Sequence, residues 1–267
     1  MSANDFHIIV LIKPVPDIEK VRFDTEKGVV DRSSVPLEIN PFDLNALEAA
    51  VQIKEKLGGK ITVVSMAPLA AESVLKDAIA RGADSAILLS DKRFAGADTL
   101  ATSYTLASAI KKLGKFDLII CGEKTVDGDT GQVGPEVAEL LDIPHIAYVS
   151  EIKQVSKDKL LVVSELGRPY LMELKLPGLI TVTKDVNKPR LPTLKDKLKA
   201  RKAKIEIWTA DDLADIADTN RFGFFGSPTQ VVKVLVPPMK KRKGQIFKGE
   251  DAIEKLIEAL KKDGILR

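Results

Sequence analysis

Short apolar runs without polar alternation recur along the chain and leave few folds open to it. They stand at residues 7–12, 61–66, 85–90, 116–121 and 145–150. Strands buried on both faces of a sheet read as continuous apolar runs, whereas half-exposed strands alternate. Segments with helical periodicity separate the runs, and such alternation favours a parallel sheet. The sequence therefore predicts an α/β fold, a Rossmann-like domain with a mostly parallel sheet and helices on both faces.

Four helices are expected between and after these runs. Asp43 is expected to cap the first and Asp98 the third, because aspartate oxygens accept hydrogen bonds from the first helical turn. The second is expected to end at Gly82, and the fourth to run from Pro135 to Leu141. Ligands of open α/β sheets bind outside the carboxyl ends of the strands. We therefore expect a site in the loops that begin near residues 13, 66, 90 and 121.

The composition excludes several classes of protein. One cysteine in 267 residues excludes an internal disulfide framework and fits a reducing compartment. Two histidines leave no metal cluster and no Cys/His nucleophilic pair, so no catalytic side chain and no metal are expected. No apolar run reaches the roughly 18 residues of a membrane span, and the first residues lack the basic start of a signal peptide. We expect a cytoplasmic location.

The stretch CGEKTVDGDTGQVGP, residues 121–135, joins an apolar run to a helical pattern. A calcium loop does not fit, because Gln132 stands where the invariant glycine belongs and Ala138 where the bidentate glutamate belongs. The phosphate-binding signature GK[ST] is missing as well. Two interpretations stay open. One is a solvated turn, and the other is a loop that holds a nucleotide through backbone N–H groups, with Asp127 and Asp129 facing the ribose.

A second loop, FAGADTLATS at residues 94–103, also follows an apolar run and opens a helix. An ordinary helix cap at Asp98 is the simplest interpretation of this loop. Hydroxyl groups and free backbone donors nevertheless crowd its first turns. Two such helix starts on one sheet edge could hold a pyrophosphate between them. Together the two loops favour a dinucleotide over a mononucleotide.

The character of the sequence changes after residue 150. Residues 151–183 are expected to form a hairpin or edge strands, and residues 184–204 form a basic segment. From residue 206 onward proline, glycine and charge predict an extended C-terminal arm, which ends in an amphipathic helix at residues 250–264. The nucleotide-binding domain is therefore expected to cover residues 1–205 and the arm residues 206–267.

Motifs along nearly the whole chain resemble the beta subunit of electron-transfer flavoprotein. They include VLIKPVPD (10–17), INPFDLNALEAAVQIKE (39–55), CGEKTVDGDTGQVGP (121–135) and NKPRLPTLKDKLKARKAKIEIW (187–208). The resemblance implies an adenine-nucleotide-binding domain, an arm that packs on an alpha subunit, and a heterodimer. Simpler members hold structural AMP in this subunit. The runs GADTLATS and DGDTGQVGP resemble the electron-bifurcating branch, in which the subunit carries FAD.

The resemblance also implies the residues that surround the cofactor, expected to be FAD with AMP as the alternative. NADH is expected as the substrate of the complex, and Gly96, Asp98, Thr99 and Thr102 are expected near the FAD diphosphate. The cofactor-binding residues are Leu11, Asn40, Asp43, Met66, Gly96, Asp98, Thr99, Thr102, Cys121, Gly122, Glu123, Lys124, Thr125, Val126, Asp127, Gly128, Asp129, Thr130, Gly131, Gln132 and Val133.

The basic segment has three interpretations. A nucleic-acid patch lacks interleaved aromatic residues, so nucleic acid is not expected, and a solvated charged face is common for such runs. The resemblance implies a surface that docks redox partners, with Leu194 as the anchor and Lys195, Lys199 and Arg201 around it.

The partners implied are the alpha subunit, ferredoxin or flavodoxin, and a dehydrogenase or quinone-linked module. In the bifurcating branch, electrons from NADH divide between ferredoxin or flavodoxin and a second acceptor. A rival from another class is a non-redox adenine-nucleotide sensor of the stress type.

Overall fold

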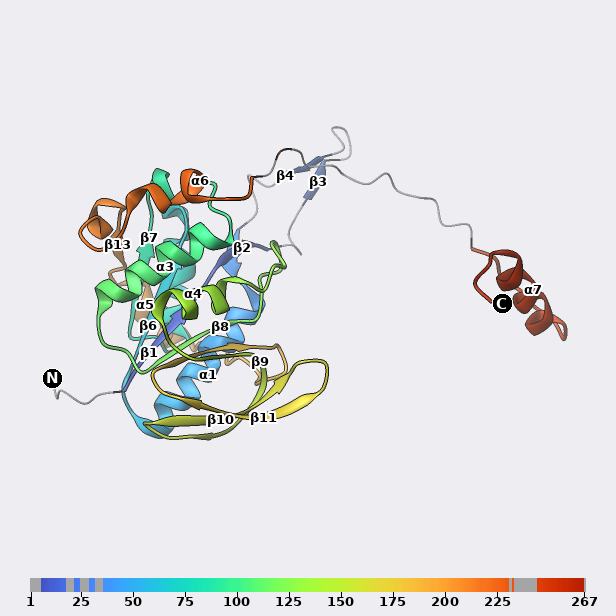
Figure 1. Cartoon of the computed structure of the whole chain (residues 1–267), viewed down its shortest axis with the longest axis horizontal. Coiled ribbons are helices and arrows are strands. Elements are labelled where there is room, and N and C mark those ends of the chain that lie inside the picture. The colour runs from blue at the N-terminus through green and yellow to red at the C-terminus, as the bar shows by residue number, and fades with distance from the viewer. Residues whose placement is uncertain are drawn as a thin grey trace. The chain divides into compact units, whose positions relative to one another are not determined.

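The computed structural model describes residues 6–17, 22–24, 29–31, 36–230, 232 and 244–266. The chain divides into two compact units, residues 1–230 and 231–267. The principal helix of the second unit is α7 (Ala252–Lys262), and Figure 1 shows the ribbon of both units. Within the described residues, no helix combines the length and the apolar character that crossing a bilayer requires.

A large sheet forms the centre of the first unit (Figure 1). Its strands are β1 (His7–Leu11), β6 (Lys60–Met66), β7 (Ser85–Leu89), β8 (Leu118–Gly122), β9 (His145–Val155), β10 (Lys159–Glu165), β11 (Pro169–Lys175), β12 (Gly178–Val182) and β13 (Glu206–Trp208). Across the described part of the chain their order is β11-β10-β9-β12-β8-β1-β6-β7-β13. In this spatial order, all neighbouring strands that follow β9 pair in parallel, as do β9 and β12. The antiparallel pairs of this sheet are β9 with β10 and β10 with β11. The predicted mostly parallel sheet is confirmed.

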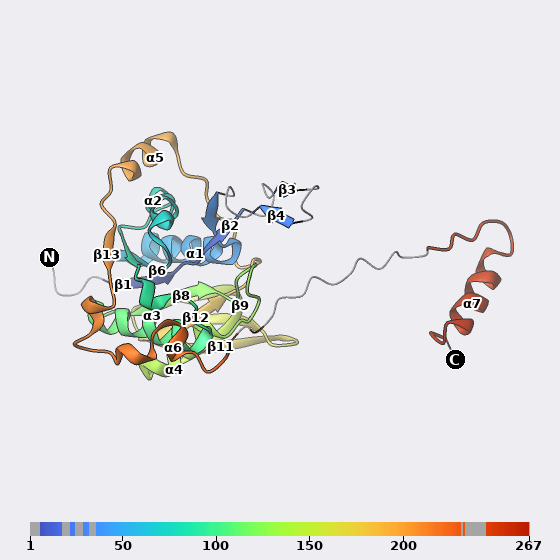
Figure 2. The ribbon, with the colours of Figure 1, turned by 90° about the horizontal axis from the view of Figure 1, so that it is seen from above.

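Helices cover both faces of the sheet. Figure 2 shows α1 (Pro41–Leu57) and α2 (Glu72–Ala80) on one face, and α3 (Thr99–Leu113) and α4 (Val133–Leu141) on the other. In β1, Ile8 and Val10 belong to the core beneath α1 and α2, whereas Ile9 and Leu11 belong to the core beneath α3 and α4. Since successive side chains of such a strand enter two apolar layers, the strand has no polar alternation.

Shorter elements lie in the connections and in the second half of the chain. Between β1 and α1, two antiparallel ladders pair β2 (Pro14–Pro16) with β5 (Leu37–Ile39) and β3 (Arg22–Asp24) with β4 (Val29–Asp31). The other elements among the described residues are η2 (Leu69–Ala71), η3 (Lys92–Phe94), α5 (Leu194–Arg201), η4 (Asp211–Leu213), η5 (Thr219–Arg221) and α6 (Gly223–Gly226).

The second half of the chain differs from the expected arrangement in two places. β10 and β11 do form a hairpin at one edge, but β12 lies between β8 and β9 and is buried along its whole length. Its run GLITV is apolar enough to lie inside a parallel sheet. Residues 206–230 also stay with the first unit, because β13 pairs with β7, and Trp208 and Phe222 are buried in the core. The units therefore separate after residue 230 rather than after residue 205.

Candidate functional site

The carboxyl ends of β1 and β8 meet where the sheet reverses its winding. After β1 the chain adds β6 and β7 on one side, and then it places β8 on the other side of β1. Such a reversal opens a crevice between two neighbouring strand ends, and α/β sheets bind ligands there. Lys13 follows β1, and Gly122 ends β8. The loop at residues 121–135 therefore starts at the point where the strand order reverses.

Asp43 joins these two strand ends. Its Oδ2 accepts the backbone N–H of Lys13 at 2.8 Å, and its Oδ1 accepts the backbone N–H of Gly122 at 2.9 Å. Burial raises the pKa of the Asp43 carboxyl to about 7, although both N–H donors oppose the rise. The expected role of Asp43 as a helix cap is wrong. Asn40 occupies the N-cap position of α1, Pro41 follows it, and Asp43 lies in the first turn.

Two glycines permit close approach at this edge. A Cβ on Gly122 would lie 2.6 Å from Asp43 Oδ1, so the contact between these residues requires a residue without a side chain. A Cβ on Gly134 would lie 2.5 Å from Thr181 Cγ2 and 2.9 Å from Cys121 Sγ. The first turn of α4 therefore lies directly against β8 and β12.

Asn40 holds the first half of the loop. Its Nδ2 donates to the carbonyl of Lys124 at 2.9 Å, and its Oδ1 accepts the N–H of Val126 at 3.1 Å. Its backbone N–H donates to the carbonyl of Lys13 at 3.0 Å. The side chain is fully buried. Asn40 was expected beside the nucleotide, and the structure shows that its amide fixes the shape of the loop that would surround one.

Both loop aspartates are neutralised by lysines. Lys13 Nζ lies 2.7 Å from Asp127 Oδ2, and Lys124 Nζ lies 2.7 Å from Asp129 Oδ1. Partial burial tends to raise the pKa of Asp127, but the hydrogen bond from Lys13 holds this pKa below its usual value. Residues 126–130 are exposed, so these pairs contribute little to stability. A ligand that offers hydroxyl donors can replace the lysines at low cost.

The starts of α3 and α4 are joined by side-chain hydrogen bonds. The hydroxyl of Thr99 donates to Gln132 Oε1 at 3.1 Å and to Glu136 Oε1 at 3.2 Å, and the hydroxyl of Ser103 donates to Glu136 Oε2 at 2.8 Å. Gln132, the N-cap residue of α4, makes no side-chain cap, and Pro135 has no N–H, so the N–H groups of Val133 and Gly134 are those left to an anion. Glu136 was missed, since a glutamate in a first helical turn is ordinary.

Asp98 caps α3 as predicted, because its Oδ1 accepts the N–H of Ala101 at 3.0 Å. Its Oδ2 is already engaged, however, by the N–H of Thr229 at 3.0 Å and by the hydroxyl of Thr229 at 2.8 Å. Gly96 has a φ of +73°, and a Cβ there would lie 3.2 Å from the Cβ of Phe224. Thr102 donates its N–H to the carbonyl of Asp98 within the first turn. The chain itself thus covers part of the surface expected to face a diphosphate.

The remaining expected residues contribute mainly backbone. Leu11 and Cys121 are buried in the core beneath α3 and α4, and Met66 is half-buried against the same core. Burial raises the pKa of the Cys121 thiol far above its usual value, so the thiol is inert. Burial also raises the pKa of Glu123, whose N–H donates to the carbonyl of Val182 at 2.9 Å.

Tyr148 was missed entirely. It has a φ of +55° inside β9, where the register with β12 shifts between the pairs Ile146–Ile180 and Val149–Val182. This register shift is typical of a β-bulge, which redirects a side chain. The phenol oxygen of Tyr148 lies 3.5 Å from the place of a Cβ on Gly131. A tyrosine in a strand is ordinary, so no sequence pattern marks the distortion.

The basic segment contains α5, which the sequence analysis did not predict. Thr193 caps this helix through a reciprocal capping box with Asp196. Leu194 is 74% exposed. Lys195, Lys199 and Arg201 are exposed as well. Among the described residues, no group of three or more His, Cys, Asp or Glu side chains is placed to hold a metal ion.

Comparison with known proteins identifies the family of this chain. Residues 27–213 match the electron transfer flavoprotein domain. The electron transfer flavoprotein subunit beta of Thermoanaerobacterium thermosaccharolyticum is 47% identical over 258 residues, which are 95% of this chain and 97% of the relative. The chain belongs to the electron transfer flavoprotein beta-subunit family.

Other proteins similar to this electron transfer flavoprotein chain come from further bacteria. The subunit beta of Megasphaera elsdenii is 46% identical over 258 residues, or 94% of each chain. The caffeyl-CoA reductase-Etf complex subunit CarD of Acetobacterium woodii is 41% identical over 235 residues, or 87% of this chain and 88% of the relative. Membership of this flavin-associated family confirms the resemblance and leaves no support for a stress-type nucleotide sensor.

Proposed function

We propose that this chain binds FAD at the crevice between β1 and β8 and, with an alpha subunit, passes electrons between NADH and partner redox proteins. The observation that carries the proposal is the uncapped start of α4, linked to the start of α3 by Thr99. Backbone N–H groups at helix starts bind phosphate, and two joined starts fit a diphosphate. The family is flavin-associated, and this supports the choice of ligand.

The chain's own residues would position the ligand. Asn40 and Asp43 hold the loop and both strand ends, so that the main chain of residues 122–133 faces the nucleotide. Asp127 and Asp129 exchange their lysine partners for ribose hydroxyls. When bound, the flavin supplies the redox chemistry, acceptance of a hydride from NADH and release of electrons. The residues near the crevice then need no acid or base role.

Structural AMP is the second candidate, and a specific observation favours it. Thr229 engages the carboxylate of Asp98, and Phe224 lies against Gly96. Thr229 and Phe224 thus occupy part of the start of α3, where a diphosphate would also have to bind. A mononucleotide needs only the loop and the start of α4.

Counting cofactors in the purified heterodimer separates the candidates. The complex is denatured, and the released nucleotides are resolved and quantified by chromatography. Two FAD per heterodimer support the proposal. One FAD with one AMP supports the second candidate. One FAD without any adenine nucleotide on this subunit would sink both.

The partners proposed are an alpha subunit, ferredoxin or flavodoxin, and a dehydrogenase or quinone-linked module, in a cytoplasmic complex that bifurcates electrons. The relative CarD belongs by its name to a caffeyl-CoA reductase-Etf complex, which supports a reductase as one acceptor. On α7, Ile253, Leu256 and Ile257 are exposed on an amphipathic helix. We assign this apolar face to the alpha subunit.

The basic segment is proposed to dock the redox partner. Leu194 would enter an apolar pocket of the partner, while Lys195, Lys199 and Arg201 face an acidic rim and speed the encounter. The substitution Leu194→Ala should raise the KM for the partner and leave reduction of the flavin by NADH unchanged. Equal losses of both activities would disprove the docking role.

A further inference from the structure

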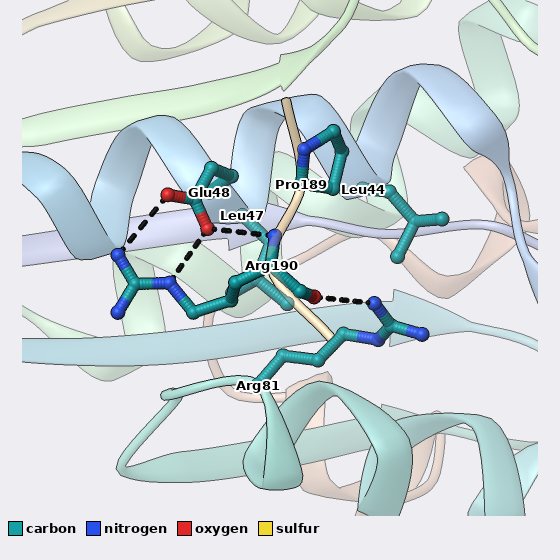
Figure 3. Close-up of a pocket in the computed structure, with 6 residues that line it drawn as sticks. All are labelled: Leu44, Leu47, Glu48, Arg81, Pro189 and Arg190. Atoms are coloured by element: carbon teal, nitrogen blue, oxygen red, sulfur yellow. Dashed lines mark hydrogen bonds and ion pairs between the residues drawn. The ribbon is translucent and has the colours of Figure 1, made fainter. Parts of the chain in front are cut away.

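Arg190, in the first half of the basic segment, is bound by two glutamates of α1. Its Nε lies 2.7 Å from Glu48 Oε2 and its Nη2 3.0 Å from Glu48 Oε1, a bidentate pair. Its Nη1 lies 2.6 Å from Glu55 Oε1. Figure 3 shows the guanidinium lying along α1 and facing Glu48. The side chain of Glu48 is only 6% exposed and that of Arg190 is 38% exposed, so water reaches the pair from the arginine side alone.

The backbone of residue 190 is held as well. Its N–H donates to Glu48 Oε2 at 3.2 Å, and its carbonyl accepts Arg81 Nη1 at 2.9 Å (Figure 3). Arg81 is itself oriented by Asp77, 2.7 Å from its Nε. The backbone N–H and the carbonyl of residue 190 are thus bound by side chains of α1 and of Arg81, the residue that follows α2. An arginine that only needed a counterion would not require this arrangement.

A second anchor lies just upstream. Asn45, also on α1, donates its Nδ2 to the carbonyl of Asn187 at 2.9 Å, and Asn187 donates its Nδ2 to the carbonyl of Asn45 at 2.9 Å. Directly after Arg190 the chain turns outward, and Leu191 is 85% exposed. Residues 187–190 are therefore held on α1, while α5 packs against α2 and leaves Leu194 and Leu198 exposed. Fixing a segment before it binds lowers the entropy lost on docking.

The same helix holds the nucleotide loop. Asn40 and Asp43, at the start of α1, bind the loop and the strand ends. Asn45, Glu48 and Glu55, further along α1, bind the basic segment. We propose that Glu48, acting through Arg190, is a positioning residue that sets the basic segment at a fixed place relative to the nucleotide loop. This inference rests on the docking role proposed above.

The test uses the heterodimer with its cofactors and the substitutions Glu48→Gln and Arg190→Lys. Glu48→Gln removes the negative charge of Glu48 at nearly constant shape. Arg190→Lys keeps the positive charge but loses the bidentate contact with Glu48. Lys54→Gln is the matched control, because Lys54 lies on α1 and pairs with Asp84 at 2.6 Å, away from the basic segment. Leu194→Ala reports on docking itself.

Two measurements are made on each protein. Hydrogen exchange compares residues 187–202 with residues 122–133 and needs no partner. Steady-state kinetics use a flavin-containing dehydrogenase that the wild-type heterodimer reduces with a measurable KM. Both clamp variants should exchange faster in residues 187–202 only. Their KM for the dehydrogenase should rise about five- to tenfold at unchanged kcat, because docking then has to order the segment. Cofactor content and reduction by NADH should stay at the wild-type level.

Each other outcome overturns the inference in a distinguishable way. If Leu194→Ala raises KM but the clamp variants do not, docking stands and the positioning role of Glu48 is wrong. If none of these variants changes KM, the docking role fails and the inference fails with it. If the clamp variants lose their cofactor, or if Lys54→Gln behaves as they do, the clamp is merely a structural contact of the fold.

Discussion

The carboxylate of Asp43 accepts the backbone N–H of Gly122 at 2.9 Å, although 79 positions separate the two residues in the sequence. Its second oxygen accepts the backbone N–H of Lys13 at 2.8 Å. One buried side chain of α1 thereby joins the carboxyl ends of two neighbouring parallel strands, at the crevice where the candidate nucleotide loop begins. The relationship leads to predictions on nucleotide retention and on pH dependence.

Replacing Asp43 with asparagine should loosen the loop. The amide offers one acceptor and one donor, so its NH₂ group opposes one of the two backbone N–H groups. We expect a loss of about 2 kcal/mol in the free energy of unfolding at pH 5, together with loss of the bound nucleotide on gel filtration. Urea unfolding and nucleotide quantification measure the two effects.

Asp117→Asn is the control for that substitution. Asp117 accepts the backbone N–H of His7 at 2.8 Å, a bond of the same kind at the first residue of β1 rather than at its carboxyl end. The control should lose stability and keep its nucleotide. Equal loss of nucleotide in the two variants would contradict a specific role for Asp43.

The contribution of Asp43 to stability should fall as the pH rises. Burial raises the pKa of this carboxyl from 3.8 to about 7. Between these values the folded protein keeps a proton that the unfolded chain has released, so stability is greatest below about pH 4 and is lost up to about pH 7. The unfolding free energy of wild type relative to Asp43→Asn should fall over this range by on the order of 4 kcal/mol, change sign before pH 7, and then level off. Urea titrations from pH 4.5 to 8.5 test this, and a constant difference would contradict it.

Gly134→Ala should be destabilising through overpacking. The added methyl group would lie 2.5 Å from Thr181 Cγ2 and 2.9 Å from Cys121 Sγ, and such insertions typically cost about 1–3 kcal/mol. The double variant Gly134→Ala with Thr181→Ser removes the nearer methyl group but keeps the hydroxyl that accepts the Tyr148 N–H at 3.0 Å. It should recover part of the loss in thermal unfolding. If the double variant recovers no stability, the contact with the Thr181 methyl group is not the cause of the loss.

At Tyr148, glycine should be more stable than alanine. Both substitutions remove the phenol, but only glycine adopts a φ of +55° without steric cost. We expect the glycine variant to be more stable by about 1 kcal/mol in urea unfolding. The same pair at Tyr170, an ordinary residue of β11, should show the opposite order, because glycine there costs more backbone entropy. The same order at both sites would contradict strain at Tyr148.

Features that depend on residues close in sequence were predictable. The apolar run at residues 7–12 predicted a strand, which the structure places at His7–Leu11. Asp98 was predicted to cap α3 because a cap and its N–H partner lie three residues apart. The glycine-rich loop was recognisable for the same reason. The lysine that pairs with Asp127 was not recognisable, however, since Lys13 comes from a distant part of the chain.

Features that depend on which distant segments meet appeared only once the chain was folded. Lys13 and Asp127 are 114 positions apart, and Arg190 and Glu48 are 142 apart. β12 entered the sheet between β8 and β9 although it follows the hairpin in sequence. Periodicity and capping reflect interactions between residues that are only a few positions apart. Pairings between remote residues follow from strand order and helix placement, which the whole core determines at once.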